Sequence, residues 1–326
     1  MQRLMRDSNK TEAERPVQPE FRIGWLAAGA LLALLVLLFR AELDRLPNRI
    51  EAGPRTVDAQ FEPVDLASGS IGPFQVTAAW KLSVDDARFG GISALALDGE
   101  GFVALTDSGV IVRFPRPGSA NPRALVDDLP GGPGRPGFKV NRDSEALAAD
   151  PLGRGWWVAF ENRDELWLYD RDFNRPLDRV ALNAPGLARN RGIEGMVVSG
   201  QDLLLFPERG ARAVSRQSGK VERIEGISGW LGDAVRLPDG RIAVIYRQAT
   251  PIGLRNSLTI LDRTETGYRA GAQWRMPIGR LDNAEALAAE PLPGGRTRLW
   301  VMTDNNFRQR QPTLLIALEL RPRPAR

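Results

Sequence analysis

The segment DNAEALAAEP, residues 282–291, decides the fold, because a near-copy of it, DSEALAADP, stands at residues 143–151. Each copy carries one acid at the same place, Glu285 or Glu145, and an aromatic, β-branched run follows both. Ala and Glu favour helices, but helix propensity is a weak prior that tertiary context overrides. A small-residue run that recurs with one fixed acid therefore predicts a repeated unit built around a strand, not an isolated helix.

Three further segments fit the same frame when all are aligned on the acid. They are GGISALALDGEGFVALTDSG (90–109), GIEGMVVSGQDLLLFPERG (192–210) and LGDAVRLPDGRIAVIYRQ (231–248). Each unit reads as a small-residue strand, a turn and a six-residue hydrophobic strand, and the units start about 40 to 50 residues apart, which is typical of propeller blades. Small Ala and Gly side chains suit innermost strands, where neighbouring blades converge. We therefore expect an all-β propeller.

The last unit ends near the C-terminus without a fourth strand. The segment FQVTAAWKL, residues 74–82, precedes the first unit and would supply that strand, closing the ring and removing an exposed edge. This closure favours five blades. A six-bladed ring stays open as the alternative if residues 58–82 form much of another blade.

The composition excludes several kinds of chemistry. The chain has 326 residues with no Cys and no His, so disulfides, thiol nucleophiles, Ser-His-Asp triads and imidazole zinc sites are ruled out. Its 44 basic and 40 acidic residues leave a net charge of only +4, and no basic block is present. We therefore expect no nucleic-acid partner. Chemistry must come from carboxylates, Arg, Lys or hydroxyl groups, or from an oxygen-bound cation.

An apolar run, IGWLAAGALLALLVLLF (23–39), lies between Arg22 and Arg40. It predicts an uncleaved membrane anchor with the rest of the chain exported to the periplasmic or extracellular side; a cleaved signal, giving a secreted protein, and a buried core helix are the alternatives. The expected organisation is a polar tail (1–22), this helix (23–39), a linker (40–57), the propeller (58–320) and a C-terminal tail (321–326).

The aligned units also align their polar residues. The first-strand positions are Ser93, Glu145, Glu194, Asp233 and Glu285. The second-strand ends are Asp107, Glu161, Glu208, Arg247 and Asp304. Carboxylates fill eight of these ten positions, and equivalent positions in a closed ring face the same region. We therefore expect them around one mouth of the central channel.

Several carboxylates in a confined space raise one another's pKa and require a counter-charge. Arg247 is one candidate, and Ca²⁺ or another divalent cation, which prefers oxygen ligands, is the other. We assign Glu145, Glu194 and Glu285 as candidate general bases, with Arg247 stabilising developing negative charge. The metal candidates are Asp107, Glu161, Glu208, Asp233 and Asp304. Each acid has a plainer reading, in which it accepts a hydrogen bond from the backbone of the neighbouring blade.

The order of the motifs FGGISALAL, LTDSG, DSEALA, VAFEN, RGIEGM, PERG, NAEALA and VMTDNNF resembles the phytase-like domain family, also described as having esterase-like activity of phytase. The resemblance covers roughly residues 74–320. It implies a secreted or membrane-anchored propeller that hydrolyses phosphate or carboxylic esters, with Asn305 joining the acids at the motif positions. Calcium-dependent propeller phytases are a precedent for acid clusters that bind Ca²⁺ and substrate phosphate.

Two functional classes follow. In the first, an ester hydrolase uses the carboxylate-lined channel, with or without a divalent cation and without an organic cofactor. In the second, a propeller without catalytic activity binds a cation or a small polar ligand at the same place. The expected partners are a small-molecule ester or polar ligand and, through the N-terminal helix, a membrane.

Overall fold

The computed structural model describes residues 28–35, 49–66, 70–182, 192–251, 253–279, 282–308 and 310–322. The chain divides into two units, Met1–Pro47 and Asn48–Arg326. In the first unit, residues 28–35 are helical; the expected tail 1–22 and the remainder of 23–39 lie outside the described residues. Within the part that is described, no helix is both long and apolar enough to cross a membrane.

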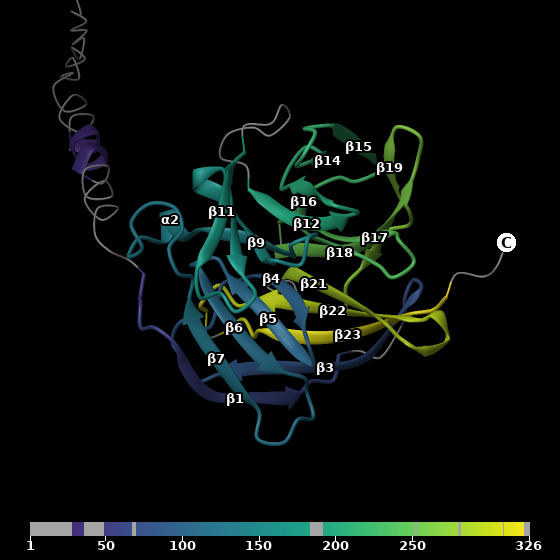
Figure 1. The fold of residues 1–326 in the computed structure, drawn as a ribbon, viewed down its shortest axis with the longest axis horizontal. Coiled ribbons are helices and arrows are strands. Elements are labelled where there is room, and N and C mark those ends of the chain that lie inside the picture. The colour runs from purple at the N-terminus through teal and green to yellow at the C-terminus, as the bar shows by residue number, and fades with distance from the viewer. Residues whose placement is uncertain are drawn as a thin grey trace, which may run out of the picture. The chain divides into compact units, whose positions relative to one another are not determined.

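Over the described residues, the strands of the second unit form three hydrogen-bonded sheets of ten, four and nine strands (Figure 1). Within these sheets, we divide the strands into five antiparallel groups along the chain. The first group is β4 (Ile92–Asp98), β5 (Gly101–Thr106), β6 (Val110–Pro115) and β7 (Arg123–Asp128). The second is β8 (Ser144–Ala149), β9 (Gly155–Phe160), β10 (Glu165–Asp170) and β11 (Pro176–Ala181). The third is β12 (Ile193–Ser199), β13 (Asp202–Pro207), β14 (Arg212–Ser215) and β15 (Val221–Glu225).

The last two groups complete the set. The fourth is β16 (Trp230–Arg236), β17 (Ile242–Thr250) and β18 (Gly253–Arg263), with β19 (Gly267–Ala270) and β20 (Trp274–Arg275) both pairing with β18. The fifth is β21 (Asn283–Pro291), β22 (Thr297–Asp304), β23 (Leu314–Leu320) and β3 (Phe74–Val84). The short elements are β1 (Arg55–Pro63), β2 (Ser70–Ile71), α2 (Lys139–Arg142), η1 (Glu161–Arg163) and η2 (Pro293–Gly295).

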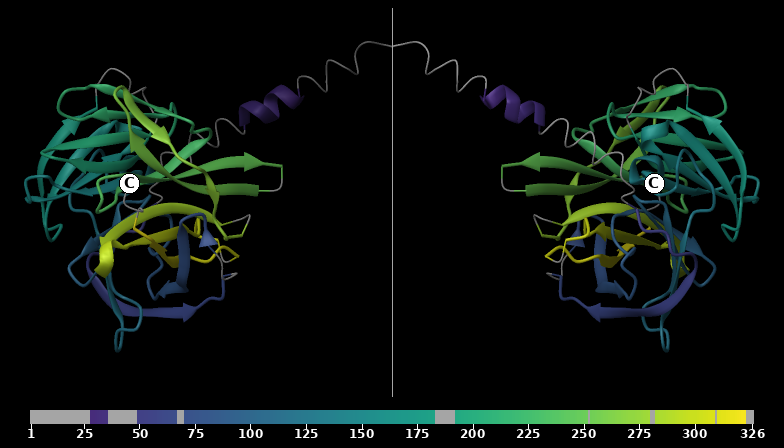
Figure 2. Two further views of the ribbon diagram at one scale, coloured as in Figure 1. Left: turned by 90° about the vertical axis from the view of Figure 1, so that its right-hand side faces the viewer. Right: turned by 90° about the vertical axis from the view of Figure 1, so that its left-hand side faces the viewer.

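The first strands of the groups lie at the centre of the molecule. β4, β8, β12, β16 and β21 contact one another in a closed cycle, and the later strands of each group lie further out (Figures 1 and 2). Buried alanines such as Ala94, Ala146 and Ala286 occupy these inner strands, where a larger side chain would push neighbouring sheets apart. The expectation of all-β structure is confirmed, and the arrangement is consistent with a β-propeller. EALAA is an inner strand in both places where it occurs.

The ring is closed by a strand from the N-terminal side. β3 pairs antiparallel with β23, with Ile316 opposite Ala79 and Leu315 opposite Trp80, so the segment FQVTAAWKL completes the fifth group as expected. β1 then pairs with β3 on one side and with β7 on the other. The outer strands of the fifth and first groups are thereby joined, which gives β3 a partner on both edges.

Of the linker expected at 40–57, the structure describes residues 49–57. Residues from Asn48 onward belong to the second unit, Arg49 is buried, and β1 begins at Arg55. Pro54 and the polar residues around it are typical of a spacer. In the structure, however, the Arg49 side chain donates to Asp128 and to the carbonyl of Gly109, which hold this segment against the first group.

Hydrophobic side chains fill the boundaries between groups, with one buried cluster at each of the five boundaries over the described residues. The strand β9 contributes side chains to two of these clusters. Trp156 packs towards the first group and Trp157 towards the third, because successive side chains of a strand point to opposite faces. The core is therefore distributed around the ring, and each group depends on both neighbours.

Candidate functional site

A β-bulge near the start of each inner strand shapes one end of the ring. One residue is skipped in each pairing of a first strand with its second strand; the bulged residues are Ser93, Glu145, Glu194, Gly232 and Glu285. A bulge leaves its residue outside the ladder and re-aims its side chain. The recurring acid of the sequence repeat is thus a bulge residue. We call the end of the ring where these bulges meet the second-strand ends the mouth.

Asp233 is not the equivalent of these acids, and its predicted place in the ring is wrong. The bulged residue of β16 is Gly232, so Asp233 is paired within the ladder, opposite Ile245. Its carboxylate accepts hydrogen bonds from the backbone N–H groups of Leu287 and Ala234, both at 2.6 Å. Leu287 belongs to the neighbouring strand β21, so Asp233 joins two groups. Burial raises the pKa of this carboxyl group well above its usual value.

The other predicted positions at the second-strand ends do align. In each group, the predicted residue comes directly after the second-strand residue of the pair that precedes the bulge. These residues are Asp107, Glu161, Glu208, Arg247 and Asp304. Asp304 accepts the backbone N–H of Asn306 at 2.7 Å, and Glu208 pairs with Arg209 at 3.3 Å. Glu208 is therefore engaged within its own loop, whereas Asp304 also accepts backbone N–H groups of Ile92 and Gly91 in the first group.

Arg247 is the cation of the mouth on the side of the third, fourth and fifth groups. Its Nη1 donates to Glu285 and, at 3.0 Å, to the side-chain oxygen of Asn283. Its Nη2 lies 3.8 Å from the Glu194 carboxylate. The side chains of all three charged residues are only 11–13% exposed. The structure thus brings together three of the four residues predicted to be catalytic.

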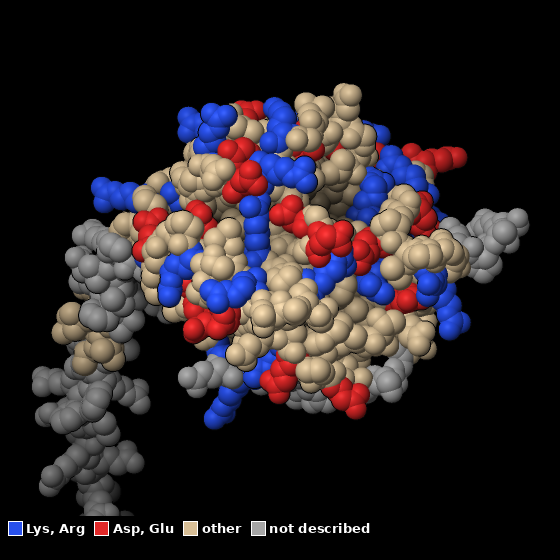
Figure 3. All heavy atoms as spheres, turned by 60° about the horizontal axis from the view of Figure 1, so that its bottom comes forward, with Lys and Arg blue, Asp and Glu red and all other residues tan. Residues whose placement is uncertain are grey.

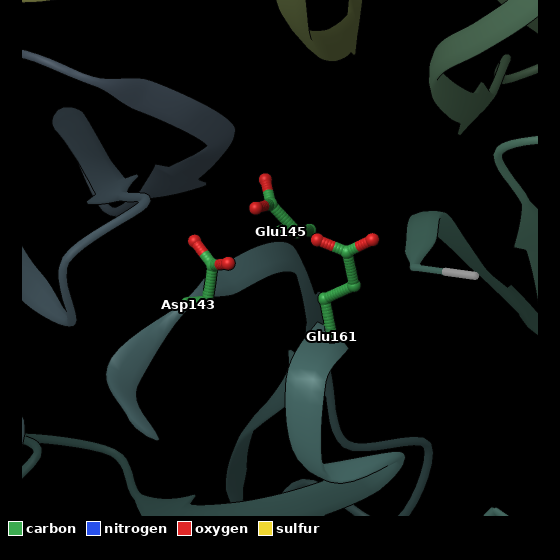
Figure 4. A group of neighbouring side chains, drawn as sticks. All are labelled: Asp143, Glu145 and Glu161. Atoms are coloured by element: carbon green, nitrogen blue, oxygen red, sulfur yellow. The ribbon is translucent and has the colours of Figure 1, made fainter. Parts of the chain in front are cut away.

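The fourth, Glu145, lies in a second cluster with Asp143 and Glu161 (Figure 4). One oxygen of each carboxylate lies within 4.8 Å of the others, and the three side chains point towards one another. They come from the start of β8 and the end of β9. Lys139 of α2 lies beside them, with Nζ 2.7 Å from Asp143 and 3.2 Å from Asp107.

Sequence reasoning missed Asp143 and Lys139. Asp143 stands two residues before Glu145, and this spacing places both side chains on the same side of an extended chain, which was a usable signal. Lys139 gave no such signal, because it lies on a single helical turn that follows the Gly- and Pro-rich loop 130–137. The three-dimensional path of that loop alone brings it to the mouth.

Burial changes the protonation of the mouth. It raises the pKa of Glu145 and Glu194 well above their usual values, and the neighbouring carboxylates raise them further. Burial also raises the pKa of Glu285 to about 7, against the opposing effect of Arg247, and that of Asp107 to about 6, against the effect of Lys139. The pKa values of Glu161 and Asp304 are raised mainly by burial as well. Glu285 and Asp107 can therefore gain and lose protons near neutral pH.

The oxygen-rich cluster fits a divalent cation. Ca²⁺ and Mg²⁺ take carboxylate ligands, and Asp143, Glu145 and Glu161 present three of them within reach of one ion. Nearby, the buried Oδ1 of Asp107 has no hydrogen-bond partner among the described residues. Of the predicted metal ligands, Glu161 alone belongs to the three-carboxylate cluster. Asp107, Glu208 and Asp304 lie at other strand ends, and Asp233 is paired within the β16 ladder, opposite Ile245.

Comparison with known proteins gives one family. The model of the family described as "Phytase-like: Esterase-like activity of phytase" matches residues 87–307, which include every mouth residue named above. No curated protein matches the sequence.

Solved structures give loose likenesses only. A putative exported protein from Bacteroides fragilis is 8% identical over 80% of this chain and 98% of that chain, with a TM-score of 0.42. A putative 6-phosphogluconolactonase from Bacteroides fragilis is 14% identical over 72% and 78%, with a TM-score of 0.37. Hydrazine synthase of Kuenenia stuttgartiensis is 13% identical over 68% of this chain and 58% of that chain, with a TM-score of 0.39. The strand pairing, and not these likenesses, therefore defines the fold.

Proposed function

We propose that this chain, which belongs to the phytase-like family, hydrolyses a phosphoric or carboxylic ester at the mouth of a five-bladed propeller. The five groups of strands are the blades. One observation carries the proposal: buried carboxyl groups with raised pKa values and one buried guanidinium converge from several groups on a single opening. Enzymes use such perturbed carboxyl groups for proton transfer near neutral pH.

The residues divide into two roles. Glu285, whose pKa is about 7, is the candidate general base, and Glu194 is its neighbour across the same guanidinium. Arg247 holds both carboxylates in place and supplies positive charge for an oxyanion that develops beside them. Because the sequence has no His and no Cys, carboxylates are the candidate general bases of this site.

A divalent cation completes the proposal. Asp143, Glu145 and Glu161 would hold it, and such an ion polarises an ester and lowers the pKa of a bound water. Lys139 keeps Asp143 and Asp107 oriented towards the opening. We further propose that residues 23–39 anchor the protein in a membrane with residues 58–320 on the outer side. Fractionation with protease accessibility tests that location, and a freely soluble cytosolic full-length protein would contradict it.

Turnover of 4-nitrophenyl phosphate and 4-nitrophenyl acetate, with Ca²⁺ and with a chelator, tests the activity. Glu285→Gln should lower turnover by about 10²- to 10⁴-fold, the usual cost of losing a general base. Glu225→Gln is the matched control, because Glu225 lies on the outer strand β15 and is half exposed. Activity that survives Gln at Glu145, Glu194 and Glu285 together would come from another site.

A second candidate function uses the same cluster without chemistry. The three carboxylates of Asp143, Glu145 and Glu161 would then bind a cation or a small polar ligand. Ligand binding without turnover of either ester would favour this function over hydrolysis.

A further inference from the structure

A small pocket opens beside the mouth, on the side of the first group. It has a volume of about 290 Å³, and Lys139, which contacts Asp107 and Asp143, forms part of its wall. Its lining includes the exposed apolar side chains of Ile50 and Phe307 and the buried Val110. We call it the side pocket. Its size lies at the small end of the range for ligand pockets.

Two arginines also line the side pocket, and this would suggest a phosphate site if their N–H groups were available. Arg49 uses Nε on the carbonyl of Ser108, Nη1 on Glu51 and the carbonyl of Pro136, and Nη2 on Asp128 and the carbonyl of Gly109. Its side chain is 1% exposed. All five N–H donors of the guanidinium are therefore in use.

Arg88 is occupied in the same way. Its Nε and Nη2 donate to Asp86, its Nη1 donates to Asp128 and to the carbonyl of Gly53, and its Nη2 also reaches the carbonyl of Val126. Its side chain is 3% exposed. The two guanidinium groups hold the segment before β1 against the first group, and they offer no free donor to an anion.

Phe307 is presented to the side pocket by a constrained loop. Its φ is 52° and that of Asn306 is 49°, which are left-handed values that bulky residues rarely adopt. The side chain of Asn305 accepts the Phe307 N–H at 2.9 Å and supports this turn. Although Phe307 is apolar, it is 51% exposed.

The ring of Phe307 also lies close to the mouth. A Cβ atom on Gly91 would stand 2.8 Å from the ring and 2.3 Å from Oδ1 of Asp107, so glycine is needed there to let the two side chains approach. The φ of Gly91 is +60°, which again favours glycine. An aromatic wall and a carboxylate of the mouth thus meet at one point.

We propose that the side pocket binds the apolar aryl or alkyl group of a small neutral or cationic ester while the ester bond lies at the mouth. The inference rests on the proposed hydrolase function and names its substrate class. Carboxylates outnumber the cations Arg247 and Lys139 at the mouth, and no arginine of the side pocket has a free donor. A polyanion such as an inositol polyphosphate therefore finds no free arginine donor in the side pocket, where a neutral ester finds apolar contact.

A binding measurement can distinguish the effect of ligand charge from the effect of ligand shape, and it does not require the protein to turn over an ester. Benzylammonium and benzoate carry the same ring with opposite charge, and calorimetry of residues 1–326 with each, in detergent, gives their dissociation constants. Benzylammonium should bind more tightly than benzoate, and inositol hexakisphosphate should not bind in the presence of a chelator. Phe307→Ala and Ala87→Trp, the latter filling the side pocket from an exposed position in its wall, should each weaken benzylammonium about tenfold.

Leu152→Ala is the matched control, because Leu152 is an exposed apolar residue on the turn between β8 and β9, outside the side pocket. It should leave binding unchanged. Benzoate or inositol hexakisphosphate binding as tightly as benzylammonium would overturn the proposal.

Turnover gives the second readout. With 4-nitrophenyl acetate, Phe307→Ala and Ala87→Trp should each raise KM about tenfold and leave kcat within about twofold. Each change removes binding of the aryl group, which is remote from the ester bond. Unaltered KM in both variants, with ester turnover intact, would overturn the side pocket and leave the proposed hydrolase function standing. Binding of benzylammonium that is lost in both variants, in a protein that turns over no ester, would support the side pocket and contradict the hydrolase function.

Discussion

Arg247 of β17 lies with its guanidinium against the carboxylate of Glu285 in β21, across the boundary between the fourth and fifth groups of strands. The same guanidinium approaches Glu194 in β12 of the third group. One buried cation thereby links three groups at the mouth. The acidic and basic side chains on the face shown in Figure 3 are interspersed, so that face carries no field of one sign.

Removing this cation should destabilise the protein. Arg247→Met leaves the Glu194 and Glu285 carboxylates buried without their counter-charge, so we expect a loss of about 3 kcal/mol in the free energy of unfolding at pH 7. The loss should shrink at pH 4.5, where the carboxyl groups are protonated. Denaturant unfolding at both pH values measures it. Arg269→Met, which breaks an exposed pair with Glu225, is the control and should cost less than about 1 kcal/mol.

The stability of the protein should fall between pH 4.5 and 7. Glu285 has a folded pKa of about 7 against a usual value of 4.5, so its contribution is fully present below pH 4.5 and is lost as the pH rises to about 7. Asp107, with a pKa of about 6, acts in the same direction. The loss from Glu285 alone is about 3 kcal/mol as an order of magnitude.

The acid side of the profile has the opposite sign. Hydrogen bonds from Arg154 and Arg263 lower the pKa values of Asp150 and Glu222 to about 2, so their contributions are lost as the pH falls towards 2. Maximum stability should therefore lie near pH 4 to 5. Glu285→Gln should flatten the fall above pH 5, and a variant whose profile matches that of the parent would contradict this assignment.

Calcium should stabilise the folded protein if the three-carboxylate cluster binds it. At a hundredfold excess over the dissociation constant, mass action adds about 2.7 kcal/mol to the free energy of unfolding, which raises the melting temperature. Asp143→Asn with Glu145→Gln should erase the response, whereas Glu208→Gln should keep it. A parent protein that ignores Ca²⁺, together with a more stable double variant, would identify the cluster as a repulsive lining.

Asp233 should behave as a structural residue and not as a metal ligand. Asp233→Ala leaves the buried N–H groups of Leu287 and Ala234 without their acceptor, which should cost about 1 to 3 kcal/mol. Asp233→Asn retains an acceptor oxygen and should cost less. The melting-temperature response to Ca²⁺ should be the same in both variants as in the parent, and loss of that response would return Asp233 to the cation site.

Deleting the closing strand should unfold the whole second unit. Without β3, β23 loses its partner, and β1 loses the strand that ties it to the fifth group. Because each hydrophobic cluster is shared by two groups, the damage should spread around the ring. Removing the C-terminal segment 282–320 should have the same effect. A single cooperative transition retained by either truncated protein would show that the ring does not depend on closure.

The sequence by itself determined the inner strands, the second strands and the chemical inventory. The two EALA segments and the three small-residue segments aligned with them predicted the inner and second strands of all five groups, and FQVTAAWKL was correctly identified as the closing strand. These features are local, because strand periodicity, turn residues and repeat spacing depend on neighbouring residues. The absence of His and Cys likewise needed no structure to exclude imidazole and thiol chemistry.

Only the tertiary structure determined which residues lie together at the mouth. A one-residue difference in the bulge of β16 places Gly232 where Asp233 was expected, and only strand pairing reveals it. The contacts of Arg247 with Glu285, and of Lys139 with Asp143 and Asp107, depend on how separate groups and loops meet at the mouth. The raised pKa values depend on burial by many groups at once. Distances and burial between segments far apart in the chain carry no local signature, so the repeat located the acids but could not show which of them act together.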